Sequence, residues 1–115
     1  MLRILLVEDS RDDADLFGFA LDNAGLQYEL RVARNERELR QALAEFQPGI
    51  VVSDLGLPGY SGLAALELAH ATHPQIPLVL LTGFDDPEPP ACPAHLLRKS
   101  ELARMPALIE VLARG

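Results

Sequence analysis

Short apolar runs alternate with helix-like segments along most of this chain, and no other feature restricts its fold as strongly. The strand-like runs cover residues 3–7, 29–33, 49–53 and 78–82. Alternation of this kind is typical of β-α-β units, in which consecutive strands lie parallel in one sheet. The central runs are continuously apolar, as expected of strands that are covered on both faces. The sequence therefore predicts an α/β fold with a doubly wound parallel sheet.

The segments between these runs carry helix signals. The first covers about residues 11–24 and is followed by Gly25, a residue type common just beyond a helix C-terminus. Its apolar side is predicted to contain Leu16, Phe17, Ala20, Leu21 and Ala24. The second is predicted to start at Asn35, with Glu38 at capping-box spacing, and the third follows Ser61.

The pattern changes after Thr82. Residues 87–93 contain four prolines, which no ordinary helix tolerates. A fourth crossover helix is therefore predicted to be shortened or replaced by a proline-rich loop. Residues 95–98 can form a fifth, short strand that delivers Lys99 at its end. Residues 100–115 are interpreted as a turn followed by a helix with Pro106 in its first turn.

Length and charge limit the class of protein. A chain of 115 residues has the size of a single domain, which can be a whole protein or the N-terminal fragment of a larger one. Its net charge of −7 disfavours direct binding to nucleic acid or anionic lipid. No apolar run is long enough for membrane insertion, so we expect a cytoplasmic protein. The single cysteine, Cys92, excludes an internal disulfide and is interpreted as a loop residue without a redox role.

Acidic residues stand where two of the apolar runs end. Asp54 directly follows the run 49–53, and the pair Glu8-Asp9 directly follows the run 3–7. The carboxyl ends of parallel strands meet at one edge of a sheet, where such sheets bind ligands. Three carboxylates there would repel one another unless a cation is present, and an all-oxygen site suits Mg²⁺ together with phosphate oxygens. The sequence therefore predicts phosphoryl chemistry at this edge.

Each part of this site also has a simpler explanation. Asp54 can be a turn residue, and the Glu8-Asp9 pair can belong to a helix N-terminus. Thr82 is an ordinary strand residue by propensity, and a lone Lys99 is usually solvated. These explanations would have to coincide at the ends of four strands on one edge. We therefore favour a common site.

Other polar residues are interpreted as structural. Asp12, Asp13 and Asp15 are expected to favour the start of the first helix electrostatically rather than to add ligands. His70 and His73 suit the C-terminal end of the third helix, and the sequence suggests no third ligand that would make them a metal site.

Several features in the right order resemble the receiver domains of bacterial two-component response regulators, over essentially the whole chain. They are the Glu8-Asp9 pair, the segment Asp54-Leu55-Gly56-Leu57-Pro58, Gly62, Thr82 and Lys99. The resemblance implies a five-stranded, flavodoxin-like sheet in the order 2-1-3-4-5. It also implies a phosphorelay function in which Asp54 is the phosphoacceptor. The donor would be a histidine kinase or a histidine phosphotransfer protein.

The same resemblance implies Mg²⁺ as the cofactor. Its protein ligands would be Asp9 and Asp54 directly, Glu8 largely through water, and the backbone carbonyl of Gly56. Lys99 and the Thr82 hydroxyl would contact phosphoryl oxygens, with Gly83 beside them in the switch segment. A receiver of this kind catalyses its own phosphorylation and autodephosphorylation, so it is not a turnover enzyme.

Two departures from the family pattern stand out. Receivers commonly carry an aromatic residue three positions before the lysine, and in this chain that position is Leu96. The missing fourth helix alters the face that receivers commonly use to dimerise, so dimerisation remains possible but the usual dimer is not assumed. The segment after Lys99 is similar to a subgroup placed before sensor, kinase or cyclic-dinucleotide domains.

Two other functions remain open. A degenerate receiver would act as an interaction module without phosphorylation, which Leu96 and the lost helix favour. A magnesium-dependent phosphohydrolase would also use a nucleophilic aspartate. That class usually needs a second aspartate two residues later, where this chain has Gly56. The output partner does not follow from the sequence.

Overall fold

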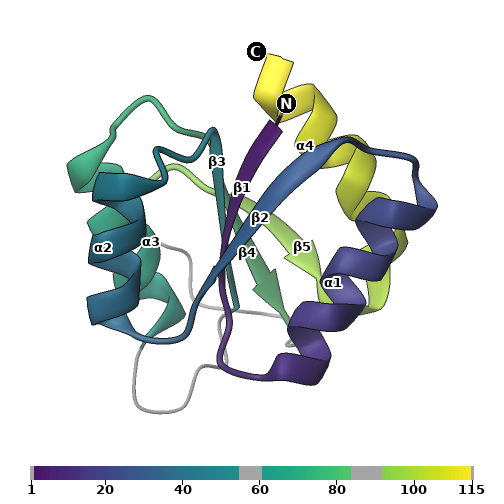
Figure 1. The fold of residues 1–115 in the computed structure, drawn as a ribbon, viewed down its shortest axis with the longest axis horizontal. Helices are drawn as coiled ribbons and strands as arrows, with labels where there is room; N and C mark the ends of the chain where they lie inside the picture. Colours follow the sequence, from purple (N-terminus) through teal and green to yellow (C-terminus); the bar gives the residue numbers. More distant parts are fainter. Residues whose placement is uncertain (1, 55–60, 84–91, 115) are drawn as a thin grey trace.

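The computed structural model describes residues 2–54, 61–83 and 92–114 (Figure 1). Its strands are β1 (Leu2–Val7), β2 (Tyr28–Ala33), β3 (Ile50–Asp54), β4 (Leu78–Thr82) and β5 (His95–Arg98). Its helices are α1 (Arg11–Asn23), α2 (Glu36–Glu45), α3 (Gly62–Thr72), a 3₁₀ helix η1 (Lys99–Arg104), and α4 (Met105–Arg114).

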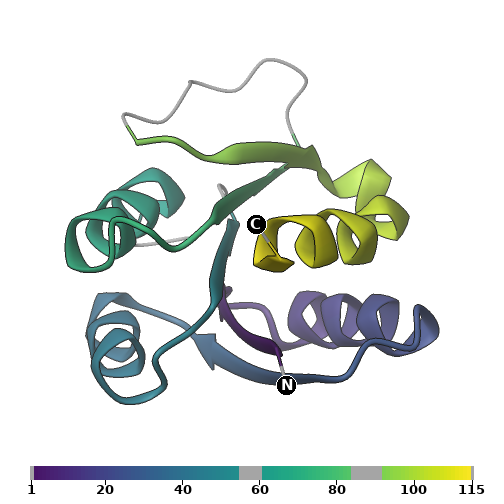
Figure 2. The same ribbon diagram turned by 90° about the horizontal axis from the view of Figure 1, so that it is seen from above.

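The five strands form one parallel sheet in the order β2-β1-β3-β4-β5. This confirms the predicted α/β architecture and strand order. Figure 2 shows α1 and α4 on one face of the sheet and α2 and α3 on the other. Each face has its own apolar core, because successive side chains of a strand point to opposite faces. Strands β3 and β4 are buried along their whole length, as their continuously apolar sequences predict.

The predicted helix starts are confirmed by their caps. The Asn35 side chain accepts a hydrogen bond from the Glu38 amide at 2.9 Å, and Ser61 caps α3 through the Ala64 amide. Only one of the two hydrogen bonds of the predicted capping box is confirmed, the one accepted by Asn35. The Glu38 carboxylate accepts from the amide of Arg34 at 2.9 Å, one residue before the cap, where it also pairs with the Arg34 guanidinium.

The predicted apolar side of α1 was too wide. Phe17 and Leu21 are buried, but Leu16 is 54% exposed and Ala24 is exposed beyond the end of the helix. Residues 16 and 17 are about 100° apart around a helix, and α1 turns the Phe17 side toward the sheet, which leaves Leu16 at the edge of the buried stripe. Gly25 has a φ of +74°, as expected for a glycine that ends a helix.

The C-terminal part follows the prediction closely. Strand β5 covers His95–Arg98, and η1 then leads into α4, whose first turn contains Pro106. Cys92 is buried in the core on the α2–α3 side, and this burial raises the pKa of its thiol, which favours the unreactive protonated form. The predicted replacement of a helix by a proline-rich loop falls largely on residues 84–91, which lie outside the described residues. Among the described helices, none is long and apolar enough to cross a membrane.

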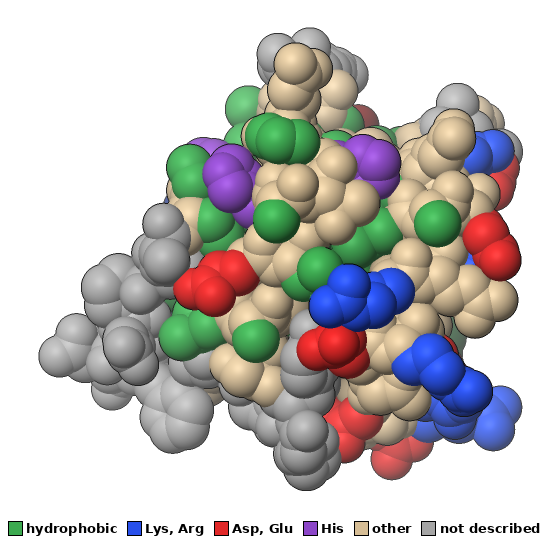
Figure 3. Space-filling model, turned by 90° about the vertical axis from the view of Figure 1, so that its left-hand side faces the viewer, with side chains coloured by type: hydrophobic (Ala, Val, Ile, Leu, Met, Phe, Trp, Pro, Cys, Tyr) green, Lys and Arg blue, Asp and Glu red, His purple; other side chains and the backbone are tan. Residues whose placement is uncertain are grey.

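Figure 3 views the side of the molecule covered by α2 and α3. Hydrophobic, acidic, basic and histidine side chains are interspersed among the described residues there. One ring nitrogen of His73 lies 3.0 Å from the Leu43 carbonyl oxygen and joins α3 to α2. This contact supports the structural interpretation of His73.

Candidate functional site

The carboxyl ends of four strands meet at one edge of the sheet, the lower edge in Figure 1. Glu8 follows β1, Asp54 ends β3, Thr82 ends β4 and Lys99 follows β5. The register fixes this arrangement, since Asp54 is paired with Leu81 and Thr82 with Arg98. The structure therefore brings the predicted strand-end residues to one place.

Asp54 is almost fully buried, with 3% of its surface exposed. Its Oδ2 atom accepts a hydrogen bond from Lys99 Nζ at 2.7 Å, within the range of a charge-assisted bond. The preceding Ser53 is also buried, and its hydroxyl donates to the Gly62 carbonyl at 3.2 Å. This bond ties the end of β3 to the start of α3 and helps to fix the backbone that carries Asp54.

Glu8 is the second buried acid, with 4% of its surface exposed. Its Oε2 atom accepts from the amides of Asp9 at 3.1 Å and Ser10 at 3.2 Å. The pKa of Glu8 is raised from 4.5 to about 7, chiefly by burial and also by the hydrogen bond and charge of Asp54, while the Ser10 amide and the Lys99 charge lower it. Glu8 and Asp54 thus share one buried environment.

Lys99 supplies a positive charge to this environment. Burial alone lowers its pKa, but the hydrogen bond to Asp54 and the charges of Asp54, Glu8 and Asp13 outweigh burial and raise the pKa. The ammonium is therefore firmly cationic. Lys99 Nζ also lies 3.8 Å from Oδ2 of Asp13 in the first turn of α1.

Asp13 belongs to this acidic cluster. Carboxylate oxygens of Glu8, Asp13 and Asp54 all lie within 4.8 Å of one another. Asp13 was expected only to favour the helix start, and its place in this cluster is an addition to that expectation. The signal was the short connection from β1 to α1, which puts the first turn of α1 at the edge where Glu8 stands. Asp9, which was predicted with Asp54 as a direct ligand, is exposed and is not part of the cluster found among the described residues. Gly56 lies outside the described residues.

The remaining predicted residues lie near the same edge. Thr82 is fully buried at the end of β4. Gly83 is exposed, and a Cβ atom there would meet nothing within 4 Å, so space does not require a glycine. Leu96 is 49% exposed on β5, an edge strand of the described sheet.

The chemistry of the donor set fits Mg²⁺. The cluster offers carboxylate oxygens only, from two buried acids and one on the rim, and magnesium prefers oxygen ligands with several retained waters. Three carboxylates at this separation can hold one cation directly or through water. The single positive charge of Lys99 does not neutralise three carboxylates. The remaining negative charge would attract a divalent cation.

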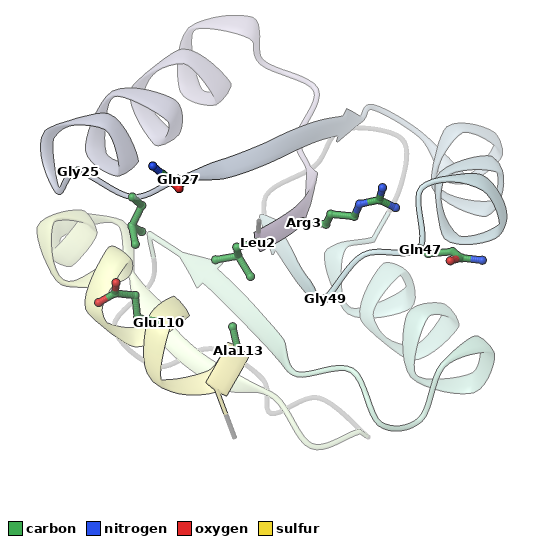
Figure 4. Close-up of a pocket in the computed structure, with 9 residues that line it drawn as sticks. Leu2, Arg3, Gly25, Gln27, Gln47, Gly49, Glu110 and Ala113 are labelled. Carbon is green, nitrogen blue, oxygen red and sulfur yellow. The ribbon is translucent and has the colours of Figure 1, made fainter.

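Two hollows of different character lie near the ends of the sheet. A cavity of about 210 Å³ adjoins the acidic cluster and is lined by Leu6, Glu8, Asp13, Leu16, Phe17, Leu81, Lys99 and Leu102. A larger one of about 640 Å³ lies at the opposite edge, where β1 begins (Figure 4). In that hollow the Arg3 side chain turns toward α2 and donates to the Phe46 carbonyl at 2.8 Å. The acidic cluster therefore lies beside the smaller cavity.

Comparison with known proteins gives a consistent result. Residues 4–91 match the family described as response regulator receiver domain. The chain is 35% identical over 83 residues to the phosphoglycerate transport system transcriptional regulatory protein PgtA of Salmonella typhimurium, a match that covers 72% of this chain and 20% of that protein. The chain spans about a fifth of the length of the first curated relatives it matches.

Solved structures agree with the fold. The signal receiver domain of a signal transduction histidine kinase from Syntrophus aciditrophicus has a TM-score of 0.83 at 25% identity, covering 100% of this chain and 92% of that one. The N-terminal domain of a response regulator/sensory box/GGDEF 3-domain protein from Carboxydothermus hydrogenoformans has a TM-score of 0.79 at 24% identity, covering 97% of this chain and 94% of that one. The second likeness supports the fold alone.

Proposed function

Because the chain belongs to the response regulator receiver domain family, we propose that Asp54 is its phosphoacceptor and that Mg²⁺ is required. The observation that carries this proposal is the buried Asp54 carboxylate, held at 2.7 Å by Lys99 beside a second buried acid at the carboxyl edge of the sheet. Membership in a two-component family implies a histidine kinase partner. The immediate donor would be that kinase or a histidine phosphotransfer protein, in the cytoplasm.

The proposed reaction is a single phosphoryl transfer. A carboxylate oxygen of Asp54 attacks phosphorus, the new O–P bond forms, and the P–N bond to the donor imidazole breaks with its electron pair left on the nitrogen. Such a transfer depends mainly on alignment and on neutralisation of the charge on the phosphoryl oxygens. The rigid end of β3, tied to α3 by Ser53, supports the alignment.

Metal binding would use the acidic cluster. The buried Glu8 and Asp54 would contribute ligands, with Asp13 at the exposed rim of the cluster, and we propose Asp9 and the Gly56 carbonyl as further ligands from the family resemblance. Bound Mg²⁺ would supply positive charge to the phosphoryl oxygens. Glu8 must lose its proton to serve as a carboxylate ligand, because its pKa is raised to about 7 in the metal-free protein.

Lys99 and Thr82 would couple phosphorylation of Asp54 to a conformational change of the domain. The Lys99 ammonium is already at the acceptor, and the buried Thr82 ends the neighbouring strand, with Gly83 next to it. New bonds from the Lys99 ammonium and the Thr82 hydroxyl to phosphoryl oxygens would favour the active conformation over the inactive one. Such a domain acts as a switch and turns over its own phosphoryl group slowly.

One observation keeps the interaction-module alternative open. Leu96 is a half-exposed aliphatic residue where the family commonly has an aromatic, so the threonine and this position cannot be coupled by a turning ring. The domain could then contact its partner through the β5 side without phosphorylation. The similar receiver domain from Syntrophus aciditrophicus belongs to a signal transduction histidine kinase, which supports the proposal that this chain too is attached to a larger sensory protein.

The test is a mass measurement of the intact protein after incubation with acetyl phosphate. Wild type should gain one phosphoryl group when Mg²⁺ is present and none when it is chelated. Asp54→Asn keeps the size of the side chain but removes the nucleophilic carboxylate, so it should gain none in either condition. An unmodified wild type would favour the interaction module, and an equal adduct on Asp54→Asn would show that another residue accepts the group.

A further inference from the structure

Lys99 lies between two carboxylates that come from different elements of the fold. Its Nζ atom is 2.7 Å from Oδ2 of Asp54, at the end of β3, and 3.8 Å from Oδ2 of Asp13, in the first turn of α1. The Asp54 side chain is 5% exposed and that of Asp13 is 46% exposed. The ammonium is therefore held mainly by the proposed nucleophile, with a second acceptor on its solvent side.

The resting contact with Asp54 opposes the proposed reaction. A charge-assisted hydrogen bond lowers the nucleophilicity of Oδ2 and occupies space that an approaching phosphoryl group needs. When Mg²⁺ is bound at the same carboxylates, the ammonium also lies close to a like charge and is repelled. An attack by Oδ2 of Asp54 therefore requires Lys99 to leave that atom before the phosphoryl group arrives.

Asp13 stands where it can receive the ammonium. A charge-assisted N–H···O bond is about 2.8 Å long, so a shift of roughly 1 Å would turn the present 3.8 Å contact into a hydrogen bond. The flexible four-carbon stem of a lysine permits a shift of this size. Without an acceptor on this side, the released ammonium would move into solvent and be less available to the phosphoryl group.

We propose that Asp13 is a positioning residue that takes Lys99 from Asp54 when the site is loaded with Mg²⁺. It keeps the ammonium within reach of the incoming phosphoryl oxygens and acts only through Lys99. This inference rests on the proposed phosphoacceptor function. It assigns to the first turn of α1 a part in the reaction beyond the electrostatic support of a helix start.

The chain offers a matched control for this role. Asp12 stands in the same first turn and carries the same charge, but it is not part of the carboxylate cluster that the structure describes around Asp54. The helix cap does not depend on the Asp13 side chain, because Ser10 accepts from the backbone amide of Asp13. Asp13→Asn and Asp12→Asn therefore both preserve the cap, and only the first removes the contact with Lys99.

The sequence also makes the measurement simple, because Lys99 is the only lysine in the chain. Protein labelled with ¹⁵N-lysine gives one side-chain ammonium signal, which is visible when the ammonium is hydrogen-bonded and protected from solvent exchange. Without Mg²⁺ the signal should be the same in wild type, Asp13→Asn and Asp12→Asn, since Asp54 holds the ammonium. With Mg²⁺ it should persist in wild type and Asp12→Asn and be lost in Asp13→Asn. Phosphorylation by acetyl phosphate should be roughly two- to fivefold slower in Asp13→Asn than in Asp12→Asn.

An unchanged Mg²⁺-loaded signal in Asp13→Asn would overturn the inference. An unchanged signal together with a Mg²⁺ affinity about tenfold or more below that of Asp12→Asn would make Asp13 a metal ligand instead. The ammonium signal is read without any phosphoryl donor. A wild type that takes no phosphoryl group would therefore count against the proposed function, while the signal still decides the role of Asp13.

Discussion

Two buried carboxyl groups and one partly exposed lysine set the chemistry of this domain at the level of single residues. Glu8 and Asp54 lie next to each other, and Lys99 is bonded to Asp54. The metal-free protein meets the repulsion between the two acids by keeping Glu8 protonated up to a pH of about 7. A bound cation would therefore be stabilised at this site. Without a cation, ionisation of Glu8 next to the Asp54 carboxylate is unfavourable.

This arrangement predicts how stability depends on pH. The pKa of Glu8 is raised from 4.5 to about 7 in the folded state, so the folded protein holds a proton that the unfolded chain has released. Its contribution to the free energy of unfolding is complete below pH 4.5 and is lost as the pH rises through about 7. Urea unfolding of chelator-treated wild type should show this loss, and Glu8→Gln, which cannot ionise, should lack it. Parallel pH profiles for the two proteins would contradict the shared buried environment.

Most of these residues could be predicted from the sequence, because the end of a strand fixes where the next side chain lies. Glu8, Asp54, Thr82 and Lys99 each follow or end an apolar run. Asp13 was missed for a physical reason. The first turn of α1 contains several acidic residues, and which of them faces the sheet edge depends on the angle at which the helix leaves β1, which the residue pattern does not encode.

Among the helices and strands, α1 links the apolar core to the acidic site. Its inner side buries Phe17 and Leu21 against the sheet and α4, while its first turn carries Asp13. The strands and the helix caps were predictable because apolar runs and capping residues determine the backbone conformation of their own segment. The true width of the buried stripe was not, because Leu16 is exposed only as a result of how α1 sits on its neighbours.

The division of α1 into a buried and an exposed side predicts unequal costs for two similar substitutions. Phe17 is 2% exposed and Phe19 is 60% exposed. Phe17→Ala should lower the free energy of unfolding by about 3–5 kcal/mol, because it removes a buried ring and leaves a cavity. Phe19→Ala should change it by no more than about 0.5 kcal/mol. Equal losses in denaturant unfolding would show that α1 packs a different side against the sheet.

In the molecule as a whole, the helices cover the two faces of the sheet, and the site lies at the edge formed by the carboxyl ends of the strands. The strand order was predicted through the family resemblance, since the local pattern of runs gives parallel strands but not their neighbours. The chain corresponds to about a fifth of the length of the first curated relatives it matches, so the remaining parts of those proteins, and their activities, have no counterpart in it. The central claim is that this edge forms an aspartyl phosphate at Asp54.

The most direct measurement is to locate that bond chemically. After incubation with acetyl phosphate and Mg²⁺, borohydride reduction converts an aspartyl phosphate into homoserine, which peptide mass spectrometry can place in the sequence. We predict homoserine at position 54 in wild type, and none there when Mg²⁺ is chelated. Homoserine at another aspartate, or none at position 54 in a protein that does bind Mg²⁺, would contradict the assignment of Asp54 as the phosphoacceptor.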